Sequence, residues 1–127
     1  MRLPDGDRIR EAIDAAQRGT SGRIGVRIVR EKSSDALEDA RRHFADARLH
    51  EYQHRNAVVL FVAPNARRFA VFGDAAIHER VGDVFWQNLV TDMQPFFARG
   101  DMTEGLLLGI GRVGEQLRLH FPSEVPV

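Results

Sequence analysis

Acidic side chains gather in one short segment, which contains Asp74, Glu79 and Asp83, and Asp101 and Glu104 lie in a later loop. Carboxylates that short turns bring together are what a hard cation such as Ca²⁺ or Mg²⁺ needs. The same residue types also begin helices, because a carboxylate at a helix N-terminus accepts backbone N–H groups. The sequence has no D-x-D-x-D-G calcium loop. We therefore weigh helix capping above metal binding at this acidic corner.

Two other motifs match known patterns by spacing alone. His50 and His54 bracket an H-E-x-x-H sequence, which in zinc proteases places two imidazoles on one helical face. Here the motif falls at the end of a predicted helix and lacks a third ligand, so we interpret it as a polar flank. Gly105-x-x-x-Gly109 resembles a contact motif of membrane helices, but the charges around it favour close packing of a soluble helix.

Two groups of side chains have structural explanations. Arg67 and Arg68 occupy a turn and are too few for a nucleic-acid patch, so we expect two solvated arginines and no nucleic-acid partner. The second group has helical spacing, which favours a core cluster over a pocket. It consists of Phe85, Trp86, Phe96 and Phe97.

No nucleophile has support in the sequence. Cysteine is absent, and the serines lie in turn, cap or tail contexts. There is no G-x-S-x-G, G-x-G-x-x-G or Walker sequence. We therefore do not expect a classical hydrolase, kinase or dehydrogenase, and we expect no organic cofactor.

The composition indicates one globular domain over residues 1–127. It is 43% hydrophobic and 28% charged, and 18 basic residues balance 18 acidic ones. No overall field therefore attracts nucleic acid or anionic lipid. The N-terminus lacks the apolar segment of a secretory signal, and no stretch approaches the roughly 18 apolar residues of a membrane span. We expect a cytoplasmic domain without membrane insertion, and the sequence leaves its oligomeric state open.

Hydrophobic periodicity predicts two helices and two strands in the first half of the chain. A helix over 7–18, capped by Asp7, precedes a strand over 23–30. A second helix over 33–50 precedes a continuously apolar strand over 57–63, which suits a strand covered on both faces. The strand-helix-strand order predicts parallel neighbours joined by a right-handed crossover. The inner face of the second helix should comprise Leu37, Ala40, Phe44 and Ala47.

The second half begins with a predicted hairpin, in which a strand over 69–72 returns antiparallel to the apolar strand. A helix then starts at Asp83 and kinks or ends near Pro95. The last helix covers 103–119, and a frayed tail covers 122–127. Together these elements predict an α/β domain with a small mixed sheet, formed by a parallel β-α-β unit plus an antiparallel hairpin. The last helix should bury Leu106, Ile110, Val113 and Leu117.

The run from Thr20 to Pro122 resembles the TPM domain family, named after a thylakoid lumen protein, a photosystem repair protein and an animal receptor modulator. The resemblance implies a three-layer α/β/α sandwich, with helices on both faces of the sheet. Some members are described as acid phosphatases that bind divalent metal, and others act in membrane-complex repair or receptor modulation without evident catalysis. The segments that carry the resemblance are Arg55–Leu60, Gly73–Ile77, Gly82–Asp83, Phe97–Asp101 and Gly105–Leu106.

On this resemblance, Asp74, Asp83 and Asp101 are the candidate metal ligands. The chain departs from the family where many members have a Gly-x-Gly-Leu-Glu corner, since His78 stands near the usual glutamate. A neutral imidazole suits transition metals better than hard cations. Arg23 also stands where relatives often have glutamate before the first strand.

Two functions follow as expectations. The first is a non-enzymatic interaction or assembly module, serving a membrane-associated protein, and we favour it because a nucleophile is missing and the acidic corner is altered. The alternative is a weak divalent-metal-dependent acid phosphatase. In that enzyme, Ca²⁺ or Mg²⁺ on the three aspartates would hold phosphate and activate water. His78 would be its general acid or base, because an unperturbed imidazole titrates near pH 6.5.

Overall fold

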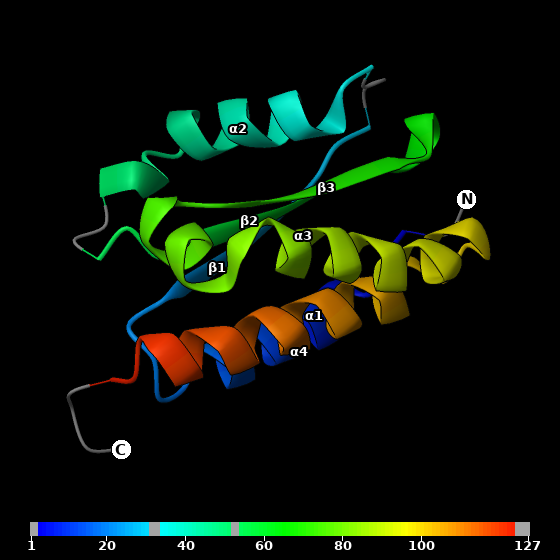
Figure 1. Ribbon diagram of the computed structural model, residues 1–127. Coiled ribbons are helices and arrows are strands. Elements are labelled where there is room, and N and C mark those ends of the chain that lie inside the picture. The colour runs from blue at the N-terminus through cyan, green and yellow to red at the C-terminus, as the bar shows by residue number, and fades with distance from the viewer. Residues whose placement is uncertain (1–2, 31–33, 52–53, 124–127) are drawn as a thin grey trace.

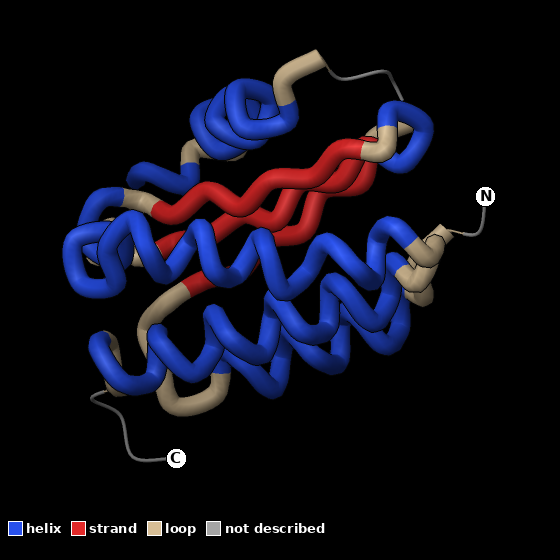
Figure 2. Tube along the Cα trace, turned by 45° about the vertical axis from the view of Figure 1, so that its right-hand side comes forward, coloured by secondary structure: helices blue, strands red, loops and turns tan. Residues whose placement is uncertain are grey.

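The structure is a computed structural model, and it describes residues 3–30, 34–51 and 54–123. A three-stranded sheet in the order β1-β2-β3 forms its middle layer. β1 (Arg23–Ile28) pairs in parallel with β2 (Ala57–Ala63), and β3 (Arg68–Gly73) pairs with β2 antiparallel. Helix α2 covers one face of this sheet, and α1, α3 and α4 lie on the other (Figures 1 and 2). The predicted α/β/α sandwich with a mixed sheet is therefore confirmed.

β2 is the centre of the core, and all seven of its residues are buried. Its side chains enter two different clusters, because successive residues of a strand point to opposite faces. Val58, Leu60 and Val62 join the cluster under α1, α3 and α4, whereas Val59 and Phe61 join the cluster under α2. A strand covered on both faces is apolar throughout, as predicted for this segment.

The first helix, α1, spans Gly6–Gln17 and begins one residue before its predicted start. Its N-cap is Asp5, not Asp7. One carboxylate oxygen of Asp5 accepts the backbone N–H groups of Asp7 and Arg8 at 3.1 and 3.2 Å. Asp7 instead lies in the first helical turn, where its charge also suits the positive end of the helix dipole.

Helix α2 is shorter than predicted and spans Ala36–Asp46. The predicted inner positions Ala40 and Phe44 are buried, but Leu37 is 51% exposed and Ala47 is exposed as well. The buried residues of α2 are Ala36, Ala40 and Phe44, which recur every four residues from the first residue of the helix. The prediction placed the inner face one residue too far along at its start and extended it beyond the end of the helix.

The segment between α2 and β2 carries the H-E-x-x-H sequence. Arg48 has a left-handed φ of 57°, and Leu49–Glu51 form a short 3-10 turn. Residues 52–53 lie outside the described residues. Helix α2 has therefore ended before the motif begins, as the interpretation of a polar flank expects.

Helix α3 begins earlier than predicted and spans Ala75–Ala98, with Asp74 as its N-cap. Gly82 interrupts it with φ 76° and ψ 171°, a conformation that glycine adopts at little steric cost. Asp83 is the first residue after this kink. The predicted start at Asp83 therefore describes only the second part of α3, which continues past Pro95 to the end of the helix.

Helix α4 spans Met102–His120 and runs antiparallel beside α3 (Figure 1). Gly109 allows it to approach the sheet, since a Cβ there would lie 2.8 Å from Leu60 and 2.9 Å from Met93. Close packing is thus the role of this glycine. Among the described residues, no helix combines the length and apolarity needed to cross a bilayer. The predicted apolar stripe is buried and comprises Leu106, Ile110, Val113 and Leu117.

Candidate functional site

The acidic corner lies where the β2–β3 hairpin meets the start of α3. In the hairpin register Val58 lies opposite Gly73, and the N–H of Asp74 donates to the carbonyl of Ala57 at 2.9 Å. Arg55 lies just before β2, so its guanidinium reaches the Asp74 carboxylate. The two groups form a bidentate pair, with Nε 2.7 Å from Oδ2 and Nη2 2.8 Å from Oδ1.

Asp74 also caps α3. Its Oδ1 accepts the N–H of Ala75 at 2.7 Å, and its side chain is 5% exposed. The main chain of Arg55 holds the same helical turn, because its carbonyl accepts the N–H of Ala76 at 3.0 Å. The hydrogen bond and then the negative charge of Asp74 raise the pKa of Arg55. We call this arrangement the Arg55–Asp74 joint, because it fixes the hairpin to α3.

His78, Asp83 and Trp86 make a second set of contacts beside the kink in α3. The indole N–H of Trp86 donates to His78 Nδ1 at 3.0 Å, and His78 Nε2 lies 3.4 Å from Asp83 Oδ1. An indole N–H only donates, so Nδ1 accepts and the proton of the neutral imidazole lies on Nε2, facing Asp83. The side chains of His78 and Asp83 are 48% and 81% exposed. The structure therefore brings these two predicted site residues together at the surface.

Trp86 owes its position to Gly73. A Cβ at Gly73 would lie 2.5 Å from Cζ2 of Trp86 and 3.2 Å from Ile77. Trp86 is partly buried against the core and meets the ring of Phe85 edge to face, at 5.0 Å between centroids. The predicted packing role of the two aromatic side chains is confirmed, and the hydrogen bond to His78 is an addition to it.

Asp101 lies at the other end of α3. It occupies the N-cap position of α4 without a side-chain capping bond, and its carboxylate lies 3.2 Å from Nε of Arg99. The helical run from Asp83 to Ala98 alone is roughly 24 Å long at 1.5 Å per residue. Asp101 is therefore not brought together with Asp74 and Asp83. Within residues 3–30, 34–51 and 54–123, no group of three or more His, Asp or Glu side chains is arranged to hold a metal ion.

Sequence reasoning missed the role of Arg55. It named the segment that begins with Arg55 as a family feature but assigned that side chain no partner. Counting outward from the Pro64 turn along both strands of the hairpin places Ala57 opposite Asp74, and Arg55 lies two residues before Ala57. The hairpin register therefore brings the two segments near each other, but the contact between the two side chains depends on the tertiary path of the chain.

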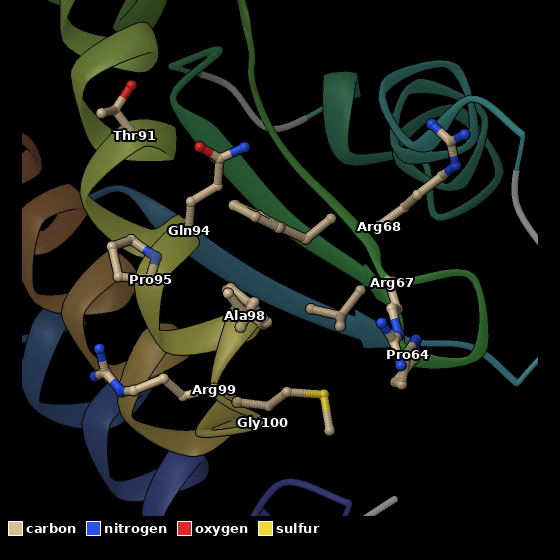
Figure 3. A pocket seen from close by; sticks show the side chains of 13 residues that line it. Pro64, Arg67, Arg68, Thr91, Gln94, Pro95, Ala98, Arg99 and Gly100 are labelled. Atoms are coloured by element: carbon tan, nitrogen blue, oxygen red, sulfur yellow. The ribbon is translucent and has the colours of Figure 1, made fainter.

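A depression of about 820 Å³ lies at the opposite end of the sheet, where β2 ends, β3 begins and α3 connects to α4. Arg67 and Arg68 lie on one side of it, and Gln94 and Arg99 lie on the other (Figure 3). Its lining contains no acidic side chain among the described residues. We call it the arginine pocket. Its apolar lining includes Val62, Phe69, Phe97 and Met102.

The layered helices, the mixed sheet and the Arg55–Asp74 joint define a small α/β/α domain with charged sites at both ends of α3. The TPM domain family model matches residues 4–116, so the chain belongs to the TPM domain family, as its sequence segments predicted.

Solved structures with this fold include the BA42 protein of the psychrophilic bacterium Bizionia argentinensis, solved by NMR. It is 28% identical over 98% of this chain and 92% of that chain, with a TM-score of 0.84. The N-terminal domain of the cg2496 protein from Corynebacterium glutamicum shares the fold, with 15% identity, a TM-score of 0.67, and coverage of 87% of this chain and 70% of that chain. No curated protein matches the chain significantly.

Proposed function

We propose that this TPM domain is a non-enzymatic interaction module and that its acidic corner is structural. The observation that supports this proposal most is the state of Asp74. Its two oxygens accept three short hydrogen bonds, two from Arg55 and one from the first turn of α3. A cation would have to compete with the guanidinium for the same oxygens and would loosen the start of the helix.

The partner that we propose is a membrane-associated protein, the kind that the non-catalytic members of the family serve. An interaction module needs a preformed surface and not a nucleophile. The arginine pocket provides such a surface on the domain, at the end of α3 remote from the Arg55–Asp74 joint.

A second candidate function is the metal-dependent acid phosphatase, and one observation favours it. His78 and Asp83 lie side by side and exposed, with the Nε2 proton of the imidazole directed at the carboxylate. If Ca²⁺ or Mg²⁺ joined Asp83 there, His78 could donate a proton to a leaving group only as the imidazolium, for which Nδ1 would first have to give up the hydrogen bond that it accepts from Trp86.

Two measurements separate these functions. Thermal melting with Ca²⁺, Mg²⁺, Mn²⁺ or Zn²⁺ tests for metal binding, since a ligand of the native state raises the melting temperature. Turnover of p-nitrophenyl phosphate at acid and neutral pH tests for catalysis. Asp83→Asn is the informative variant, and Asp14→Asn, an exposed residue of α1, is its matched control.

We expect that none of these metals raises the melting temperature. We also expect that both variants show the same turnover of p-nitrophenyl phosphate as the unmodified domain. The non-enzymatic proposal is overturned by a different pattern. In that pattern, metal stabilises the domain and supports turnover, and both effects disappear in Asp83→Asn while Asp14→Asn retains them.

A further inference from the structure

The arginine pocket has the dimensions of a binding site. Its volume of about 820 Å³ lies within the range of roughly 300–1,000 Å³ typical of ligand sites. It also lies where β2 reaches its carboxyl end, which is the edge of an α/β sheet where ligands commonly bind. Both the location and the size of this depression are those expected of a binding site.

The floor of the pocket is preformed. The rings of Phe69 and Phe97 stack with centroids 4.3 Å apart and planes 19° apart, which joins β3 to α3. Val62 and Met102 are 2% and 5% exposed, so they are already fixed in the core. An apolar side chain of a partner would therefore meet a rigid apolar floor, with little ordering cost on this side.

The rim of the pocket carries positive charge that the fold does not neutralise. Arg67 and Arg68 are exposed, and neither forms a salt bridge with any described residue. Arg99 is only partly compensated: its guanidinium packs over the ring of Phe96 at 4.8 Å and pairs with the exposed Asp101. Because the whole chain has a formal net charge of +0, this is a local patch and not a consequence of a basic protein.

The arrangement of the arginines selects the shape of the anion. Figure 3 shows Arg68 extending toward α2 and Arg99 extending to the opposite side, so the two guanidinium groups flank the pocket and do not converge on one point above its floor. A single phosphate needs converging donors, whereas acidic residues spaced along a chain match separated arginines. Gln94 lies between them on α3 (Figure 3), with an exposed amide that can both donate to and accept from a peptide backbone.

Nucleic acid fits the pocket poorly. Bases bind proteins that offer free aromatic faces, but Phe69 and Phe97 stack on each other and Phe96 lies under Arg99. We propose that the arginine pocket binds an extended acidic segment of a partner protein, with an apolar side chain on the floor and carboxylates against Arg67, Arg68 and Arg99. This inference rests on the proposed interaction function and names the site and the chemistry of the partner.

The test uses fluorescence anisotropy with a labelled peptide that alternates glutamate and leucine. Binding should weaken as NaCl rises, because the rim charges are exposed. Arg67→Asn combined with Arg68→Gln should raise Kd about tenfold, since it removes two charges from the rim. Asparagine tolerates the left-handed φ of 53° at position 67, so this variant keeps the turn.

Matched controls separate charge at the pocket from charge elsewhere. Arg10→Gln combined with Arg80→Gln removes the same charge from exposed positions outside the pocket and should leave Kd unchanged. Gln94→Glu adds a negative charge of nearly the same shape inside the pocket and should weaken binding. A peptide with serine in place of leucine should bind less tightly, because it leaves the apolar floor uncovered.

The inference is overturned if the alternating peptide does not bind, or if the pocket variants and the control variants bind it equally. It is also overturned if inorganic phosphate or vesicles of anionic phospholipid displace the peptide, since the pocket would then serve a single anion or a membrane. These results concern only the occupant of the pocket. Failure of the proposed function has a separate readout, the metal-dependent turnover that Asp83→Asn removes.

Discussion

The two ends of α3 both carry charged side chains, but the fold uses them differently. At the start of the helix, Asp74 is buried and fully engaged by Arg55 and a backbone N–H. Across the arginine pocket from its end, Arg67 and Arg68 of the hairpin are exposed and have no ionic partner among the described residues. The contrast teaches that a charged residue type does not itself mark a functional site. What matters is whether the fold already satisfies the charge.

The largest effect expected from this contrast is on stability, when Asp74 is replaced by alanine. The change removes a helix cap and two charged hydrogen bonds, and it should lower the free energy of unfolding by about 3 kcal/mol. Asp101→Ala is the matched change at the other end of the helix, where the N-cap side chain makes no capping bond. It should cost less than about 1 kcal/mol, as for an exposed ion pair. Urea unfolding of both variants compares the two ends directly, and equal losses would contradict a structural role confined to the first end.

The next largest effect is expected for Gly73→Ala. The new methyl group would meet the Trp86 ring at 2.5 Å, and such overpacking costs about 2 kcal/mol. Gly111→Ala is the control, because a Cβ there meets nothing within 4 Å, and it should stabilise α4 by up to about 1 kcal/mol. Tryptophan fluorescence should shift only in the first variant. An unchanged Trp86 environment there would mean that the corner is looser than the structure indicates.

A smaller effect concerns acid pH, where the phosphatase alternative would be assayed. Burial, and then the charge of Arg27, lower the pKa of His43, against an opposing effect of Asp46. The unfolded chain therefore binds this proton more tightly than the native state does. The stabilisation that neutral His43 contributes is complete above pH 6.5, which is the ordinary pKa of a histidine side chain. It is lost as the pH falls through the lower pKa of the folded state.

His43→Gln should accordingly flatten the loss of stability between about pH 7 and about pH 5, as measured by urea unfolding at each pH. His54→Gln, at an exposed position before β2, is the control and should retain the slope of the unmodified domain. If the slope survived in His43→Gln, the acid sensitivity would belong to another group, and the acidic corner would be the first place to examine.

The smallest effect on stability is expected at the pocket. Arg67→Asn combined with Arg68→Gln should change the free energy of unfolding by no more than about 0.5 kcal/mol, because exposed, unpaired side chains contribute little to it. Circular dichroism melting checks this result. A clear destabilisation would remove the difference between the two ends of α3, because these arginines would then be structural as well.

The sequence predicted those elements of the fold that a single local residue pattern is enough to identify. The apolar run of β2 could only be a covered strand, the turn after it indicated a hairpin, and the stripe through Leu106 and Ile110 indicated α4. The start of α3 was missed, because the few residues between Asp74 and Gly82 are too short to show helical periodicity and a glycine followed by aspartate reads as a helix start. The candidate site was missed for a different reason. Arg55 and Asp74 are 19 residues apart, and the arginine pocket draws on four elements, so both depend on tertiary arrangement.

The kink at Gly82 divides α3 into two pieces that contact different parts of the fold. The piece before it is tied to the hairpin by the Arg55–Asp74 joint, and the piece after it packs along α4 through Leu89 and Met93. A break in a helix interrupts its ladder of amide hydrogen bonds, so we expect amides near Gly82 to exchange with deuterium much faster than those of either piece. If the first piece opened, the amides of the second piece would remain protected from exchange. The shape of the arginine pocket would then be preserved as well.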